Sequence, residues 1–213
     1  MVSISNSQRT PLPWANWSQT VYHGLPEDLY KFHPEPGEYF SFIGRLSPEK
    51  RVDRAIEIAI ACNTPLYVAA KIDKADEAYF EREIRAKLDH PLIHFIGEIN
   101  EEKKHALLSR SKALLFPIDW PEPFGLVMIE AFSCGVPVIA YPHGSVPEII
   151  KEGVNGFLVH DQQQAVAAAK EIGQIDRAQC RETFMRRFTA SHMAKNYLQV
   201  YEKIIGLAIN STH

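Results

Sequence analysis

Cysteine is scarce in this sequence, and no apolar run is long. The three cysteines, Cys62, Cys134 and Cys180, are odd in number and widely spaced, so neither a disulfide framework nor a paired-cysteine metal site is expected. No apolar stretch approaches the length that spans a bilayer, and residues 1–10 lack the apolar core of a secretory signal. These absences predict a protein of the reducing cytoplasm with no transmembrane segment.

An excess of charge is also missing. The formal net charge is -3, and the lysines and arginines are scattered along the chain, which disfavours a surface for nucleic acid or anionic membrane. Histidines and acidic residues do not recur at metal-ligand spacing, so no metal is expected. A glycine-rich fingerprint after the first strand is absent too, which weighs against an oxidoreductase on a Rossmann sheet.

The chain does contain an alternation of short apolar runs with longer amphipathic ones from residue 38 onward. This pattern predicts an α/β fold, a Rossmann-like parallel sheet with helices on both faces, followed by C-terminal helices. The expected strands are residues 38–44, 66–71, 92–97, 113–117, 136–141 and 156–159. The expected C-terminal helices are residues 162–173, 176–188 and 191–209.

The first thirty or so residues differ in composition, because they are rich in Pro, Asn, Ser and Trp. They read as a connector with one short strand at residues 20–23. We therefore expect three parts: a connector at 1–20, a Rossmann-like domain at 21–190, and a C-terminal helix at 191–213.

The loop after the first strand carries two cations close to a helix start. Ser47 is expected to cap the helix and Pro48 to occupy its first position. A helix N-terminus already has a positive partial charge, so Arg45 and Lys50 beside it are unfavourable unless an anion such as phosphate binds there. The alternative is that Glu49 and Asp53 neutralise both cations as ordinary surface pairs.

The loop after the fourth strand carries two carboxylates flanking a second helix start. Prolines on both sides keep Glu122 out of a helix, and the helix is expected to begin near Gly125. Glu130 then lies roughly 6 to 9 Å further along the axis. Carboxylates of this kind accept hydrogen bonds from hydroxyl pairs. The alternative for Glu130 is a carboxylate paired with a nearby cation, since an unpaired one among apolar neighbours is costly.

A third loop contains Ser145 and Glu148 at the spacing of a capping box, which favours a structural role for Glu148 over a ligand role.

The last helix carries an apolar stripe, which predicts self-association if part of it is uncovered. The members of that stripe are Met193, Tyr197, Val200, Tyr201, Ile204 and Ile205.

Glu122 and Glu130 form an E-x7-E pattern within residues 121–140, and residues 44–50 read Gly-Arg-Leu-Ser-Pro-Glu-Lys. With residues 21–25, 95–97 and 144–149, these motifs closely resemble the group 1 (family 4) retaining glycosyltransferases of GT-B fold. The resemblance implies a hexosyltransferase-type reaction on a nucleotide-diphosphate sugar, which is a substrate rather than a cofactor. The implied donor-site residues are Gly44, Arg45, Lys50, Glu122, Phe124, Gly125, Leu126, Val127 and Glu130.

Within that implied site, Arg45 and Lys50 bind the diphosphate, Glu122 and the backbone of 124–127 bind the sugar and phosphate, and Glu130 binds the ribose. Glu122, Arg45 and Lys50 are the implied catalytic residues. The family also has an N-terminal domain that holds the acceptor, and this chain contains nearly none of it. The resemblance implies that residues 1–20 are a remnant of that domain or a connector, 21–190 the donor-binding domain and 191–213 the crossover helix. The isolated chain is therefore expected to be inactive, and a non-catalytic nucleotide-sugar-binding module or a subunit of a split enzyme remains the alternative.

Overall fold

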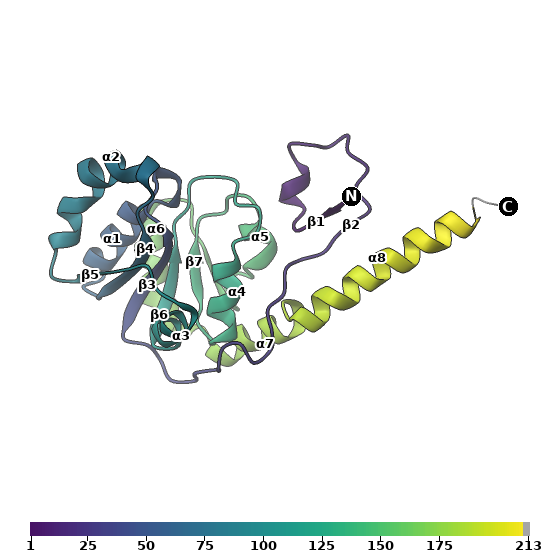
Figure 1. The fold of residues 1–213 in the computed structure, drawn as a ribbon. Helices are drawn as coiled ribbons and strands as arrows, with labels where there is room; N and C mark the ends of the chain where they lie inside the picture. Colours follow the sequence, from purple (N-terminus) through teal and green to yellow (C-terminus); the bar gives the residue numbers. More distant parts are fainter. Residues whose placement is uncertain (211–213) are drawn as a thin grey trace.

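Six parallel strands form the main sheet of the computed structural model, which describes residues 1–210 and the side chains of residues 1–206 (Figure 1). Their order across the sheet is β5-β4-β3-β6-β7-β8. The bounds are β3 Tyr39–Arg45, β4 Leu66–Lys71, β5 Ile93–Gly97, β6 Ser111–Phe116, β7 Val138–Ala140 and β8 Gly156–Leu158. All six expected strands are present, so the predicted α/β fold is confirmed.

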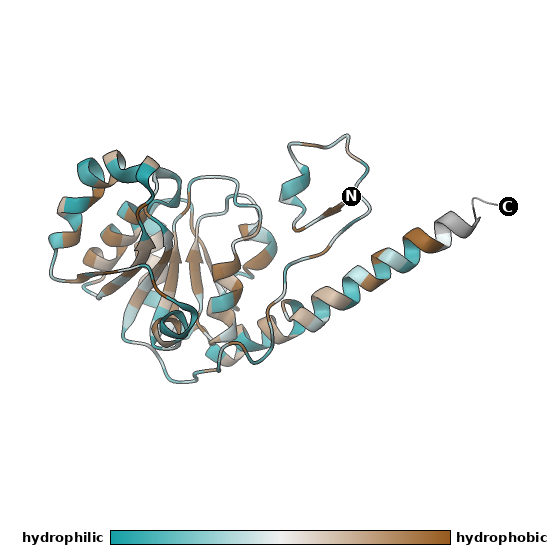
Figure 2. Cartoon of the chain, viewed as in Figure 1, coloured by the Kyte–Doolittle hydropathy of each residue, from teal (hydrophilic) through white to brown (hydrophobic). Residues whose placement is uncertain are grey.

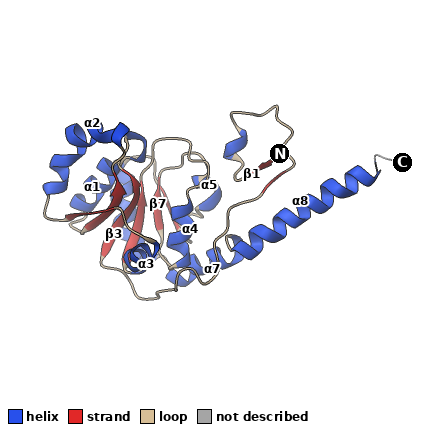
Figure 3. Cartoon of the chain, in the orientation of Figure 1, coloured by secondary structure: helices blue, strands red, loops and turns tan. Residues whose placement is uncertain are grey.

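Two groups of helices cover the sheet. Helices α1 and α6 pack on each other, while α4 packs against both α3 and α7, and the two groups lie on opposite faces (Figures 1 and 3). The bounds are α1 Val52–Ala61, α2 Glu77–Tyr79, α3 Glu101–Ser109, α4 Leu126–Ser133, α5 Val146–Ile149, α6 Gln162–Glu171, α7 Arg177–Arg187 and α8 Ala190–Asn210. Shorter helical turns are Ser7–Arg9, Pro48–Lys50, Lys74–Asp76, Phe80–Ile84, Arg85–Asp89 and Ile172–Gln174. The three expected C-terminal helices are present.

The core lies on both faces of the sheet. Every residue of β7 is buried, as are the last four of β6, because a strand covered by helices on both sides must be apolar at successive positions. Figure 2 shows this as nearly continuous hydrophobic colour along the central strands, against alternating colour on the outer helices. This double coverage makes the sheet a rigid platform for the loops at its edge.

The start of α1 differs from the prediction. Pro48 opens a short 3₁₀ turn rather than the long helix, and Ser47 makes no capping hydrogen bond. Arg51 then adopts a left-handed conformation with φ of 53°, and α1 begins only at Val52. Lys50 therefore lies in a separate turn before the helix, so the prediction that placed it in the first turn of α1 is wrong.

The prediction of a capping box at α5 is also wrong. The Ser145 hydroxyl donates to the carbonyl oxygen of Phe124 at 2.9 Å and makes no cap. The Glu148 carboxylate instead accepts from the backbone N–H groups of Asn6 and Ser7, both at 2.8 Å, and from the Tyr22 hydroxyl at 2.9 Å. A glutamate on α5 thus binds the N-terminal segment.

The N-terminal segment forms a small parallel pair of its own, set apart from the main sheet (Figure 3). Strand β1 (Val2–Ser3) pairs with β2 (Gln19–Thr20). The strand expected at 20–23 is therefore shifted, because pairing with β1 ends at Thr20. The division at residue 20 stays a prediction.

Helix α8 extends away from the sheet as a long rod (Figure 1). Val200 is buried, Met193 and Tyr197 are half-buried, and Tyr201 and Ile205 are 54% and 59% exposed. The predicted stripe is thus covered at its start and open toward its end. Residues 211–213 of the predicted crossover helix lie outside the described residues.

Within the described part of the chain, no helix is both long and apolar enough to cross a membrane. The three cysteines are free thiols, two of them buried.

Candidate functional site

The strand order places a topological switch point between β3 and β6. The chain runs outward from β3 to β4 and β5, then crosses back to β6 and runs outward again to β7 and β8. In open α/β sheets the crevice at such a point, beyond the carboxyl ends of the strands, is where ligands bind. The two loops that leave β3 and β6 are those that the sequence analysis singled out.

These two loops are tied to each other. The backbone N–H of Asp119 donates to the carbonyl oxygen of Glu49 at 2.8 Å. Arg51 bridges Asp53 at 2.8 Å and Asp119 at 2.9 Å, and Arg54 adds a contact to Asp119 at 3.2 Å. The left-handed turn at Arg51 therefore directs a guanidinium across the crevice and fixes the separation of its walls.

Lys50 and Glu122 meet in the crevice although 72 residues separate them. The Lys50 Nζ lies 2.6 Å from Glu122 Oε2, and the two side chains are only 17% and 13% exposed. Trp120 donates its indole N–H to the same oxygen at 3.0 Å, and its ring lies 5.0 Å from the Lys50 Nζ. Oε1 of Glu122 accepts no hydrogen bond within residues 1–206, so it is available to a hydroxyl group.

Arg45 lies in a more open place. Its side chain is 50% exposed and contacts Glu49 at 3.1 Å and Asp73 at 3.7 Å. Arg45 thus has the contact with Glu49 that the alternative describes, while half of its side chain stays open to solvent. Lys50 does not pair with Asp53, because Asp53 contacts Arg51 instead.

The start of α4 presents unpaired backbone donors to the crevice. Gly125 has φ of 79°, a conformation that residues with a side chain rarely adopt, so the backbone favours glycine there. The N–H groups of Leu126 and Val127 are at the first two helix positions and have no acceptor within the helix. The predicted helix start near Gly125 is confirmed, with Phe124 buried beneath it.

Two glycines shape the crevice in different ways. Gly144 has φ of 61°, and a Cβ there would lie 2.3 Å from the backbone of Glu122, so glycine allows the loop after β7 to pack directly on the Glu122 loop. The Ser145 N–H fastens this contact by donating to the Glu122 carbonyl at 2.9 Å. A Cβ on Gly44 would meet only the Phe42 ring at 3.9 Å. Protein packing therefore does not require glycine at position 44, whereas the close approach of a ligand would.

Glu130 is buried on α4 with one cation. Its carboxylate Oε1 lies 3.0 Å from the Nζ of Lys104 on α3, which also contacts Glu101 at 2.7 Å. Burial raises the pKa of Glu130 above its usual range, and Lys104 opposes that rise. The expectation that Glu130 needs a partner is confirmed, and the alternative of a paired carboxylate describes this geometry.

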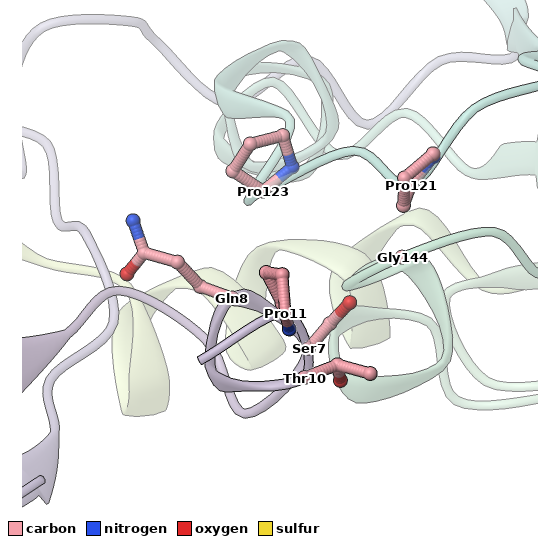
Figure 4. A pocket seen from close by; sticks show the side chains of 7 residues that line it. All are labelled: Ser7, Gln8, Thr10, Pro11, Pro121, Pro123 and Gly144. Atoms are coloured by element: carbon pink, nitrogen blue, oxygen red, sulfur yellow. The ribbon is translucent and has the colours of Figure 1, made fainter. Parts of the chain in front are cut away.

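A pocket of about 380 Å³ lies between these loops and the N-terminal segment (Figure 4). Pro121 and Pro123 form one wall, Gly144 borders it, and the turn around Ser7 and Pro11 forms the other. The pocket thus adjoins Glu122, and its far wall is held in place by the contact of Glu148 with the N-terminal backbone.

Two other groups border this region. The His23 ring packs edge-on against Phe124 at 5.0 Å, and burial lowers the pKa of His23. Burial, followed by the hydrogen bond to Glu148, raises the pKa of Tyr22 to about 12. Among the described residues, no three or more His, Cys, Asp or Glu side chains are grouped in a way that could hold a metal ion.

Sequence reasoning missed three contributors to this site: Trp120, Lys104 and the anchoring role of Glu148. Trp120 stands two residues before Glu122, and its indole N–H was an available signal. No local pattern pairs Lys104 with Glu130, 26 residues later, because that contact depends on how α3 and α4 pack.

Comparison with known proteins gives a family match over most of the chain. A family model described as "Glycosyl transferases group 1" matches residues 30–183. An uncharacterized 41.2 kDa protein in the cps region of Klebsiella pneumoniae is 29% identical over 167 residues, covering 76% of this chain and 45% of that protein. The chain spans about half the length of such curated relatives.

Solved structures share the fold. The Anabaena protein HepE in complex with UDP and glucose superimposes with a TM-score of 0.83 at 19% identity, covering 95% of this chain and 62% of that one. The C-terminal domain of a group 1 glycosyl transferase family protein from Francisella tularensis matches with a TM-score of 0.66 at 20% identity. It covers 78% of this chain and all of that one.

Proposed function

The chain belongs to the group 1 glycosyltransferases, and on that premise we propose that its crevice binds a nucleotide-diphosphate sugar for transfer of the glycosyl group. One observation carries this proposal: a cation and a carboxylate from two loops, Lys50 and Glu122, meet at 2.6 Å at the switch point of the sheet. Beside them, α4 begins with unpaired N–H groups.

Each group in the crevice suits one part of such a donor. Arg45 and Lys50 bind the diphosphate together with the N–H groups of Leu126 and Val127, since an anion is stabilised by cations and by a helix N-terminus. Gly44 leaves room for that group. Glu122 accepts from a sugar hydroxyl through its unpaired Oε1, and Glu130 accepts from the ribose.

The same contacts assist transfer. When the bond between sugar and phosphate breaks, negative charge grows on the departing diphosphate, and fixed donors placed there stabilise that charge without reorganising. We also propose that transfer retains the anomeric configuration of the sugar. A separate N-terminal domain or a partner chain would hold the acceptor and would face the pocket between Pro123 and Pro11.

A binding panel tests the donor site. We expect UDP, ADP or GDP, or their sugars, to bind the 213-residue chain with millimolar affinity, because only one wall of a two-domain site encloses them. NMR titration measures this range. Unchanged spectra with all of them would overturn the proposal, and we expect EDTA to leave the affinity unchanged.

A second candidate is a module that binds nucleotide sugars without transferring them, alone or as the subunit of a split enzyme. Its contacts would be those described above, because the donor groups all lie on this sheet. Turnover separates the two candidates. We expect the isolated chain to transfer no sugar, and transfer to appear when a partner supplies an acceptor site.

A further inference from the structure

Lys104 is an interior cation that the roles above leave unused. Its side chain is 16% exposed, and its Nζ donates to two carboxylates, Glu101 at 2.7 Å and Glu130 at 3.0 Å. Glu101 is a surface residue with a side chain 62% exposed, whereas the Glu130 side chain is 11% exposed. Lys104 therefore connects the surface of α3 with a buried carboxylate of α4.

The two oxygens of Glu130 are in different environments. Oε1 accepts from Lys104, while Oε2 accepts no hydrogen bond in the described part of the chain. Oε2 is not fully buried. In this it differs from the hydroxyl oxygens of Ser47 and Ser109, which are buried without a hydrogen-bond partner. One oxygen is thus held by the protein, and the other is unpaired within residues 1–206 but not fully buried.

Among the described residues, few ionisable groups face Glu130. From α3 these are Lys104 and Glu101. From the segment before β3 it is Tyr30, whose hydroxyl donates to Glu101 and whose ring stacks on the His105 ring. Burial raises the pKa of Glu130, the negative charge of Glu101 raises it further, and Lys104 alone lowers it. Burial and the nearby carboxylates raise the pKa of Tyr30, so it stays neutral.

We propose that Lys104 is a positioning residue of the nucleotide site, holding Glu130 by Oε1 so that Oε2 accepts from the ribose hydroxyl pair. This inference rests on the proposed donor site. Only an ionised carboxylate can accept through both oxygens, so Lys104 also keeps Glu130 in its binding form. Without Lys104, burial and Glu101 would favour the protonated form, and binding would become sensitive to pH.

The test compares Lys104→Met with the matched control Lys103→Met, since Lys103 is the exposed neighbour on the same helix. The affinity for the tightest-binding nucleoside diphosphate of the UDP, ADP and GDP panel is measured by NMR titration from pH 5 to 8.5. Removing an opposite charge at this distance shifts the pKa of a carboxyl by roughly 1 to 3 units. We expect the pH at which binding weakens to rise by that amount in Lys104→Met and to stay unchanged in Lys103→Met.

Below its new midpoint, the variant should lose roughly tenfold in affinity per pH unit, and near pH 8.5 it should come within about threefold of wild type. The difference should vanish with the 2′,3′-dideoxy form of the same nucleotide, which has no hydroxyl for Glu130. Lys104→Arg keeps the cation and should restore the wild-type profile. Lys104→Gln should give the same pH profile as Lys104→Met, and it replaces that variant in the titration if Lys104→Met does not fold.

The outcomes separate this inference from the proposed function. If wild type binds but Lys104→Met and Lys104→Gln keep its pH profile, the inference is overturned and the donor site stands. A loss of equal size at every pH, or one that persists with the dideoxy nucleotide, also overturns it, because it points to a direct contact or to a packing defect. If wild type binds none of the nucleotides, the proposed function falls and this inference falls with it.

Discussion

The buried pair of Lys50 and Glu122 allows a quantitative test of how the crevice is held together. We consider Lys50→Met, Glu122→Gln and the double variant. Removing one partner of a buried pair leaves a desolvated charge and costs about 3 to 5 kcal/mol, whereas exposed pairs contribute about 0 to 1 kcal/mol. With side chains 17% and 13% exposed, this pair lies near the buried limit.

The two single variants should differ. Lys50→Met leaves the Glu122 carboxylate with the Trp120 indole N–H as its one remaining donor among the described side chains, so we expect a loss of about 2 to 3 kcal/mol in the free energy of unfolding. Glu122→Gln leaves Lys50 over the Trp120 ring at 5.0 Å. That ring offsets part of the loss by about 0.5 to 2 kcal/mol, so this variant should be the less destabilised.

Urea denaturation of the four proteins gives the coupling energy between the two residues. We expect about 1 to 3 kcal/mol, because contacting residues in one network couple at this level. The same cycle on Arg45→Met and Glu49→Gln is the control, since that pair is 50% and 32% exposed and should couple by no more than about 1 kcal/mol. Equal coupling in both cycles would refute the argument that burial sets the strength of the crevice pair.

Three further outcomes are expected. Arg45→Ala and Lys50→Ala should each weaken nucleoside diphosphate binding by roughly 10- to 150-fold while sparing the nucleoside, because a charge-assisted hydrogen bond contributes about 1.5 to 3 kcal/mol. Glu130→Ala should weaken binding of the nucleoside and of the nucleoside diphosphate alike. If Arg45→Ala and Lys50→Ala bind the diphosphate with wild-type affinity, the donor site is disproved. Glu148→Ala should speed hydrogen exchange at the amides of Asn6 and Ser7, which it accepts at 2.8 Å, and unchanged exchange would show that other contacts hold this segment. Light scattering should detect self-association that Ile205→Glu abolishes, since Ile205 is 59% exposed on α8; a strict monomer at high concentration would contradict this.

Local pattern was sufficient to predict the elements of the sheet. Apolar runs such as residues 66–71 are long enough and uniform enough to specify a strand covered on both faces, and the observed β4 has those bounds. The start of α4 was predictable for a similar reason, because Pro121 and Pro123 restrict the backbone at their own positions and Gly125 permits the left-handed conformation at the helix start.

Features that depend on distant residues were not predictable in the same way. The capping-box spacing of Ser145 and Glu148 was misleading because Phe124 and the N-terminal backbone compete for those side chains, and neither is close in sequence. The Lys50 contact with Glu122 likewise requires the strand order that brings β3 beside β6. Local propensity describes what each residue can do, whereas packing selects which partner it takes.

The contact of Glu148 with Asn6 also bears on how the protein emerges from the ribosome. The two residues are 142 positions apart, and chains are made at roughly 5 to 20 residues per second. About 7 to 28 s therefore pass between synthesis of the N-terminal turn and synthesis of the carboxylate that fixes it. During that interval the turn after β1 lacks the carboxylate of α5 that later accepts from its backbone N–H groups. Slowing translation near residue 148 should lengthen this interval without changing the finished fold.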